Sequence, residues 1–223
     1  MSQIPDLPIE TRLRKMLAEQ LVCVIRAANS ERAINAAHAL LNAGFKHIEV
    51  TMTVPGAVEA IKHLASIVPA DAMIGAGTVM SGYEARQCID AGAQFIVSPI
   101  CEVDMIRPCR DAGVVAIPAA LTPTEIVHAY RMGAHVVKIF PAGSVGGPAY
   151  IRALRGPLPD IPFWVSGMVG ARDAQDYLRA GVQLVGLGFA ELLPQALVEA
   201  GDWEGVTTHA RSVRLTARGQ TET

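Results

Sequence analysis

The fold class is decided by a pattern that is clearest in residues 90–99, where the chain runs Asp90-Ala91-Gly92-Ala93-Gln94-Phe95-Ile96-Val97-Ser98-Pro99. An amphipathic stretch ends here at a glycine, and a short apolar run follows it at once. Glycine suits a helix end because the residue after the last turn often takes positive φ. An unbroken apolar run is typical of a parallel strand that is buried on both faces. The segment therefore predicts a helix that leads into a buried parallel strand.

The same junction recurs along the chain, at Asn42-Ala43-Gly44-Phe45, Asp111-Ala112-Gly113-Val114, Arg131-Met132-Gly133-Ala134 and Arg179-Ala180-Gly181-Val182. The five glycines are 48, 21, 20 and 48 residues apart, and each gap of 48 holds two units of 24. Helices are therefore also expected to end near residues 68–69 and 155–156. With a strand before the first junction and a helix after the last, this rhythm predicts eight β–α units.

Strands are predicted at 21–27, 47–53, 72–79, 95–99, 114–119, 136–140, 163–166 and 184–188. Helical stretches alternate with them, among them 31–43, 57–67, 83–91, 125–132, 149–154 and 171–180, and a short helix at about 7–19 precedes the first strand. Ser30 is the predicted N-cap of the helix at 31–43. Eight units in 223 residues predict an α/β fold, a single-domain (β/α)8 TIM barrel over 1–223. The competing fold is a doubly wound open sheet, which usually carries a glycine fingerprint after its first strand, and residues 21–28 carry none.

The composition limits the class of protein. The chain is 51% hydrophobic and 18% charged, which allows a sizeable core and excludes a disordered chain. A net charge of −2 without a basic block argues against a nucleic-acid partner. Apolar stretches such as 113–121 are about half as long as a membrane span, and residues 1–15 lack the apolar region of a secretory signal. Four cysteines without metal-binding spacing predict reduced thiols in a cytoplasmic protein.

In a TIM barrel the active site lies at the carboxyl ends of the strands. The polar residues at those predicted ends are therefore the candidates: Arg26, Glu49, Thr51, Thr53, Thr78, Ser98, Lys138, Ser166 and the glycines of 186–188.

Lys138 is the strongest candidate, because it lies in an apolar strand with no carboxylate within ten residues on either side. Burial lowers the pKa of an ammonium group, and a neutral amine in an apolar pocket is what imine formation with a carbonyl requires. The alternatives are a lysine at a strand end that reaches solvent, or one that pairs with a carboxylate from another strand.

Glu49 is the candidate partner of Lys138. It is an acid in an otherwise apolar strand, with Thr51 and Thr53 on the same face. A carboxyl group in such surroundings can have a raised pKa and transfer protons, or it can be a structural acid paired with a base. A lysine that forms an imine beside a glutamate that transfers protons is the constellation of an aldolase that works through a pyruvate enamine.

The chain resembles the class I 2-keto-3-deoxy-6-phosphogluconate and 4-hydroxy-2-oxoglutarate aldolases, and within them the 6-phosphogalactonate branch. The motifs that carry the resemblance are Ile48-Glu49-Val50, Gly75-Ala76-Gly77-Thr78-Val79, Ile96-Val97-Ser98-Pro99, Val137-Lys138-Ile139-Phe140-Pro141 and, for the branch, residues 147–154. The resemblance implies that Lys138 forms the Schiff base, that Glu49 is the acid and base, and that Thr78, Pro99 and Phe140 line the pocket. It also implies a homotrimer without metal or cofactor. The expected reaction is reversible cleavage of a 2-keto-3-deoxy or 2-keto-3-deoxy-6-phospho sugar acid to pyruvate and glyceraldehyde 3-phosphate or a related aldehyde.

This chain differs from the family in the residues expected to bind each end of the substrate, the carboxylate and the 6-phosphate. Thr53 stands where many phosphogluconate members have an arginine. The galactonate-like members also lack that arginine and have one at the end of the first strand, which Arg26 matches. The resemblance therefore implies Arg26 as the ligand of the substrate carboxylate, since a guanidinium group suits it; the alternative is an exposed residue that caps the first strand. At the other end, Met168 replaces the second glycine of a pair and Phe189 replaces a serine, and these bulky residues are expected to compete with a 6-phosphate. Ser166 and the amides of Gly167, Gly186 and Gly188 are the remaining phosphate ligands.

Two other interpretations of the function stay open on these residues. One is a phosphate-binding isomerase or epimerase that uses Glu49 as a base without an imine, and the other is a barrel that only binds a sugar acid. The pair Gly75 and Gly77 makes a poor dinucleotide fingerprint. His47 and Glu49 share a strand face, but no third metal ligand lies near them in the sequence.

Overall fold

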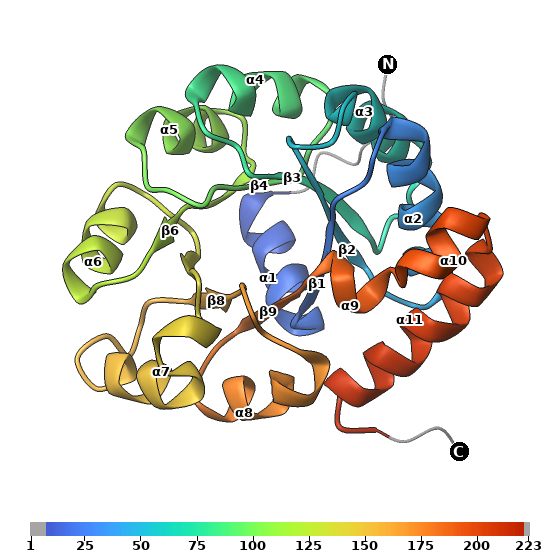
Figure 1. Ribbon diagram of the computed structural model, residues 1–223. Coiled ribbons are helices and arrows are strands. Elements are labelled where there is room, and N and C mark those ends of the chain that lie inside the picture. Colours follow the sequence, from blue (N-terminus) through green and yellow to red (C-terminus); the bar gives the residue numbers. More distant parts are fainter. Residues whose placement is uncertain (1–7, 221–223) are drawn as a thin grey trace.

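Parallel strands close into a barrel in the computed structural model, which describes residues 8–220 (Figure 1). The strands are β1 (Leu21–Ile25), β2 (His47–Thr51), β3 (Met73–Gly77), β4 (Phe95–Val97), β5 (Val115–Ile117), β6 (Ala119–Ala120), β7 (Val137–Ile139), β8 (Phe163–Val165) and β9 (Leu184–Leu187). They are ordered β5-β4-β3-β2-β1-β9-β8-β7-β6, and β1 pairs in parallel with both β2 and β9. The predicted TIM-barrel fold is confirmed.

Two of these segments, β5 and β6, make up one strand of the barrel. Pro118 separates them, and proline has no N–H with which to continue a ladder. β5 pairs with β4 on one side, and β6 pairs with β7 on the other. The carbonyl of Pro118 still accepts a hydrogen bond from the backbone N–H of Lys138 at 2.9 Å. The nine segments therefore correspond to the eight predicted strands.

Helices alternate with the strands and surround the barrel. They are α2 (Ser30–Asn42), α3 (Ala57–Ile67), α4 (Gly82–Asp90), α5 (Val103–Asp111), α6 (Pro123–Arg131), α7 (Gly147–Arg155) and α8 (Ala174–Arg179), followed by α9 (Phe189–Leu192), α10 (Gln195–Ala200) and α11 (Trp203–Ala217). Two short 3-10 turns, η1 (Gly143–Val145) and η2 (Ala171–Asp173), precede α7 and α8. All five junction glycines have positive φ: Gly44 94°, Gly92 100°, Gly113 65°, Gly133 103° and Gly181 101°.

Several local predictions need correction, and most predicted strands are too long: 47–53 is His47–Thr51, 72–79 is Met73–Gly77, 95–99 is Phe95–Val97 and 136–140 is Val137–Ile139. The first strand is two residues shorter than the predicted 21–27, because the chain leaves the sheet after Ile25. Ser30 begins α2, and the cap is Asn29, whose side chain accepts a hydrogen bond from the N–H of Arg32 at 2.9 Å. The helix predicted at about 7–19 is α1 (Ile9–Glu19), and residues 1–7 and 221–223 of the predicted domain lie outside the described part.

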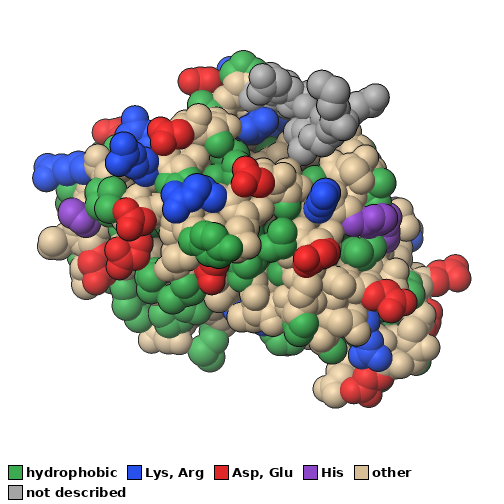
Figure 2. Space-filling view, turned by 90° about the horizontal axis from the view of Figure 1, so that it is seen from above, with side chains coloured by type: hydrophobic (Ala, Val, Ile, Leu, Met, Phe, Trp, Pro, Cys, Tyr) green, Lys and Arg blue, Asp and Glu red, His purple; other side chains and the backbone are tan. Residues whose placement is uncertain are grey.

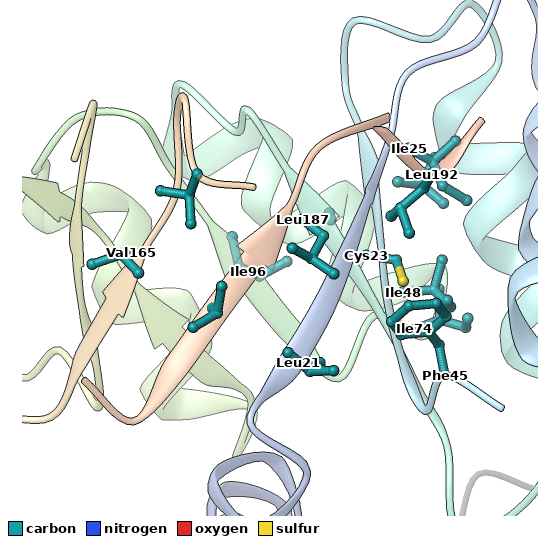
Figure 3. Close-up of a cluster of buried hydrophobic side chains, with 14 of the residues drawn as sticks. Leu21, Cys23, Ile25, Phe45, Ile48, Ile74, Ile96, Val165, Leu187 and Leu192 are labelled. Carbon is teal, nitrogen blue, oxygen red and sulfur yellow. The ribbon is translucent and has the colours of Figure 1, made fainter. Parts of the chain in front are cut away.

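Successive residues along each strand face two different hydrophobic cores, one outside the barrel and one inside it. In β1, Leu21, Cys23 and Ile25 belong to the core shared with the outer helices, and Figure 3 shows Cys23 beside Ile48 and Ile25 beside Leu192. Val22 points into the barrel and packs with Phe95, Trp164 and, from α1, Met16. These inner residues fill the barrel, and α1 covers the end at which the strands begin. The carboxyl ends of the strands are left as the open end.

The surface carries charges of both signs. On the face in Figure 2, acidic and basic side chains are interspersed, and hydrophobic patches lie between them. Among residues 8–220, no helix combines the length and the apolar character that crossing a membrane requires.

Candidate active site

A cavity of about 310 Å³ lies at the carboxyl ends of the strands. Most predicted site residues line it: Arg26, Glu49, Thr78, Pro99, Lys138, Phe140, Ser166, Gly167, Gly186 and Gly188. Thr51, Thr53 and Ser98 do not. Further lining residues that the sequence reasoning had not assigned are Val24, Val169, Ala190 and Glu191. The barrel therefore brings together residues that are more than 160 positions apart in the chain.

Lys138 enters this cavity from the middle of β7, whose other residues, Val137 and Ile139, face the outer core. Its side chain is 6% exposed. Nζ lies 5.0 Å from the ring centroid of Phe140 and 5.8 Å from that of Trp164. Within the described chain, no ion pair is formed by its ammonium group. Burial lowers the pKa of Lys138 below its ordinary value, the charge of Arg26 adds to this, and the charge of Glu49 opposes it.

Glu49 reaches the same cavity from β2 and is 1% exposed. Burial raises the pKa of its carboxyl group, while the positive charges of Lys138 and Arg26 act in the opposite direction. Its Oε2 makes no hydrogen bond to another described residue. Glycine at position 77 on β3 makes room for Glu49, because a side chain there would collide with the Glu49 carboxylate. The neighbouring strand thus leaves room for a carboxyl group that has a free oxygen.

Arg26 is held over the mouth of the barrel by threonines from two loops. Its Nη1 donates to Thr53 Oγ1 at 2.8 Å, and its Nη2 donates to Thr78 Oγ1 at 3.3 Å. Thr53 is 2.8 Å from Thr51 Oγ1, which in turn donates to the carbonyl of Ile25 at 3.1 Å. Thr78 adopts φ 55°, which is rare for a β-branched residue. Thr53 does not line the cavity and instead orients the guanidinium group.

The loops after β8 and β9 form the remaining side of the cavity. Gly167 has φ 84°, and a side chain there would press against the Phe140 ring. Met168 lines the cavity and is also 81% exposed, so its side chain stands at the cavity mouth; whether its bulk competes with a phosphate stays a prediction. Phe189 is 40% exposed and contributes to the wall. Glu191 was missed, although an acid three residues beyond Gly188 at the end of the last strand was a usable signal.

His47, which shares a strand face with Glu49, lies at the opposite end of the barrel. Its Nε2 is 3.4 Å from the carbonyl of Lys15 in α1, and it is absent from the cavity lining. Among the described residues, no three His, Cys, Asp or Glu side chains are grouped as a metal site.

Residues 9–209 match the family described as KDPG and KHG aldolase. The chain belongs to this family. It is therefore an aldolase, an aldehyde-lyase of the class I, Schiff-base type that yields pyruvate. Family membership favours this function over the isomerase and the non-catalytic barrel.

Relatives from both branches of the family are similar to this aldolase. The 2-dehydro-3-deoxy-phosphogluconate aldolase of Pseudomonas aeruginosa is 34% identical, over 91% of this chain and 90% of its own. The probable 2-dehydro-3-deoxy-6-phosphogalactonate aldolase of Rhizobium meliloti is also 34% identical, over 91% of each chain.

Solved structures agree with this assignment. The KDPG aldolase of Legionella pneumophila, with pyruvate captured at low pH as a covalent carbinolamine intermediate, has a TM-score of 0.81 and 28% identity, over 90% of this chain and 97% of that one. A native KDPGal structure has a TM-score of 0.79 and 27% identity, over 98% of both chains.

Proposed function

We propose that this aldolase cleaves a 2-keto-3-deoxy sugar acid, with or without a 6-phosphate, through an imine on Lys138. The products are pyruvate and glyceraldehyde 3-phosphate or a related aldehyde. The observation that carries the proposal is a buried lysine whose pKa is lowered, in the same cavity as a buried glutamate whose pKa is raised. Such opposite shifts mark an amine suited to attack and a carboxyl group suited to proton transfer.

Lys138 supplies the nucleophile. The neutral Nζ attacks C2 of the keto acid, a C–N bond forms, and the former carbonyl oxygen takes up a proton. Loss of this hydroxyl group as water leaves a protonated imine. The C3–C4 bond then breaks, its electron pair moves towards the imine nitrogen, and the C4 hydroxyl loses its proton as the aldehyde leaves. The enamine takes a proton at C3, and water hydrolyses the imine to pyruvate and free lysine.

Glu49 transfers the protons in this scheme. It gives a proton to the departing hydroxyl group of the carbinolamine, accepts the C4 hydroxyl proton and returns a proton to C3. Its raised pKa suits a group that must both donate and accept near neutral pH. The unpartnered Oε2 supports this role, since it is available to substrate or to a bridging water.

Arg26 binds the substrate carboxylate, because a guanidinium group pairs with a carboxylate through two parallel hydrogen bonds. Thr53 and Thr78 are positioning residues for Arg26. Pro99 and Phe140 form apolar walls that keep water from the imine, and Ser166, Gly167 and Gly188 face the distal part of the substrate.

Borohydride reduction in the presence of pyruvate tests this function. Reduction of the imine should leave a stable mass adduct that peptide mapping places on Lys138. The Lys138→Met variant should give no adduct and should lose more than about three powers of ten in turnover. Lys46→Met is the matched control, because Lys46 lies at the surface in an ion pair with Asp71. An adduct on another lysine, or turnover retained in Lys138→Met, would contradict the proposal.

The assembly is proposed to be a homotrimer, by analogy with the family. Residues 33–41 are apolar on more than one helix face in the sequence, which would favour an oligomer. They do not support it in the structure, because α2 buries Ala33, Ala36 and Leu40 within the chain. Support comes instead from α4 and α5, where Tyr83 and Val103 are exposed and Tyr83 lines a hollow of about 780 Å³. A second copy that covers these side chains would remove apolar surface from water.

A cytoplasmic location is likewise proposed. All four cysteines are free, and three of them are buried. Burial raises the pKa of the Cys88 and Cys109 thiols to about 12, so these groups stay protonated and unreactive. Unpaired cysteines are typical of a reducing compartment.

A further inference from the structure

Glu191 places a carboxylate in the wall of the active-site cavity, between the loops that follow β8 and β9. The backbone N–H of Ala171 donates to its Oε1 at 2.9 Å and to its Oε2 at 3.1 Å. The carbonyl oxygen of Glu191 is 2.7 Å from His209 Nε2, which ties α9 to α11. Hydrogen bonds thus fix both the side chain and the backbone of Glu191, and no step of the mechanism above uses this residue.

This carboxylate lies in the part of the cavity that would receive the distal end of the substrate. In TIM barrels the loops after the seventh and eighth barrel strands frequently bind a phosphate group, and here these are the loops after β8 and β9. Of the described residues that line the cavity, only Arg26 and Lys138 are basic. Both are engaged elsewhere, at the substrate carboxylate and at C2. A phosphate group at this end would therefore meet a negative side chain without a cation to offset it.

We propose that Glu191 is a specificity-determining residue that reduces the preference for a 6-phosphate and favours a terminal hydroxyl group. This rests on the proposed function of the same cavity. A carboxylate is only an acceptor and has about four lone-pair sites, of which the single Ala171 N–H occupies one or two. A substrate hydroxyl group can donate to the rest, whereas a phosphate dianion cannot donate and is repelled.

The test compares kcat/KM for 2-keto-3-deoxygluconate and for its 6-phosphate. Glu191→Gln keeps an oxygen for the Ala171 N–H and removes the charge. It should raise the ratio of phosphorylated to unphosphorylated kcat/KM by about ten- to a hundredfold, the effect of one charge-assisted interaction. Deuterium exchange into pyruvate should stay unchanged, because pyruvate does not extend to Glu191. The control is Glu204→Gln, an exposed acid in the first turn of α11, which should leave the ratio as it is.

Ala190→Lys gives a second, independent reading. Ala190 is exposed and lines the same wall, so a lysine there adds a cation and leaves Glu191 and its hydrogen bonds in place. It should also raise the ratio, and if Glu191→Gln fails to fold it still shows whether charge on this wall acts on the distal end of the substrate. An unchanged ratio in these variants, with pyruvate exchange intact, overturns the role of Glu191 alone. Absence of pyruvate exchange in the unaltered protein contradicts the proposed function instead.

Discussion

At the scale of single residues, Glu49 and Lys138 are each buried where neither charge is well solvated. The Glu49→Gln variant separates the two roles. It should still form the imine with pyruvate slowly, because Lys138 remains. Exchange of the pyruvate methyl protons should fall by about 10²–10⁴-fold, the usual contribution of a general acid or base. Proton NMR in deuterated buffer measures this exchange. The control is Glu59→Gln, because Glu59 is an exposed acid on α3. A fall of less than about tenfold would rule out the proton-transfer role.

Arg26 combines two effects that one variant can reveal. In Arg26→Gln the KM for pyruvate should rise by about ten- to a hundredfold, because a bidentate carboxylate contact is lost. The positive charge of Arg26 also lowers the pKa of Lys138, so its removal should raise that pKa. Imine formation needs the neutral amine, and the ascending limb of its pH profile should therefore move to higher pH. Arg86→Gln, on the exposed face of α4, should change neither the KM for pyruvate nor the pH profile. An unmoved pH profile in Arg26→Gln would show that Arg26 does not influence the pKa of Lys138.

At the scale of elements, β3 is shaped by the side chain of its neighbour β2. Gly77→Ala adds a methyl group where the Glu49 carboxylate lies. Overpacking of this kind should lower the free energy of unfolding by about 1–3 kcal/mol and slow pyruvate exchange by displacing Glu49. Urea denaturation measures the first effect. Gly156→Ala is the control, because its φ is −53° and the nearest atom to the new methyl group is 3.7 Å away. Equal stability of the two variants would show that β2 and β3 do not constrain each other at this position.

At the scale of the whole molecule, the exposed apolar residues of α4 and α5 concern assembly. Light scattering at micromolar concentration should give three times the chain mass of 23.6 kDa. Tyr83→Glu should lower this mass, because it places a charge in the apolar surface that a second copy would cover. His63→Glu, at an exposed site on α3, should not. A single-chain mass for the unaltered protein would refute the trimer, and a trimer that tolerates Tyr83→Glu would place the interface elsewhere.

Helix ends and the shared face of Glu49, Thr51 and Thr53 follow from the sequence, because glycine junctions and two-residue alternation are local properties of the backbone. The strand order follows from the repeat of eight β–α units, which predicts a barrel. The strand predicted at 21–27 was too long, since only the register with β2 shows where pairing ends. Tertiary structure alone decided the exposure of Met168 at the cavity, the hydrogen bond from Arg26 to Thr53 and the presence of Glu191 in the cavity wall. These three features arise in the segments that follow different strands, Glu191 in the short helix α9 and the others in loops. Loop side chains have no periodicity to reveal their direction, and they meet only because closure of the barrel brings distant strand ends to one face.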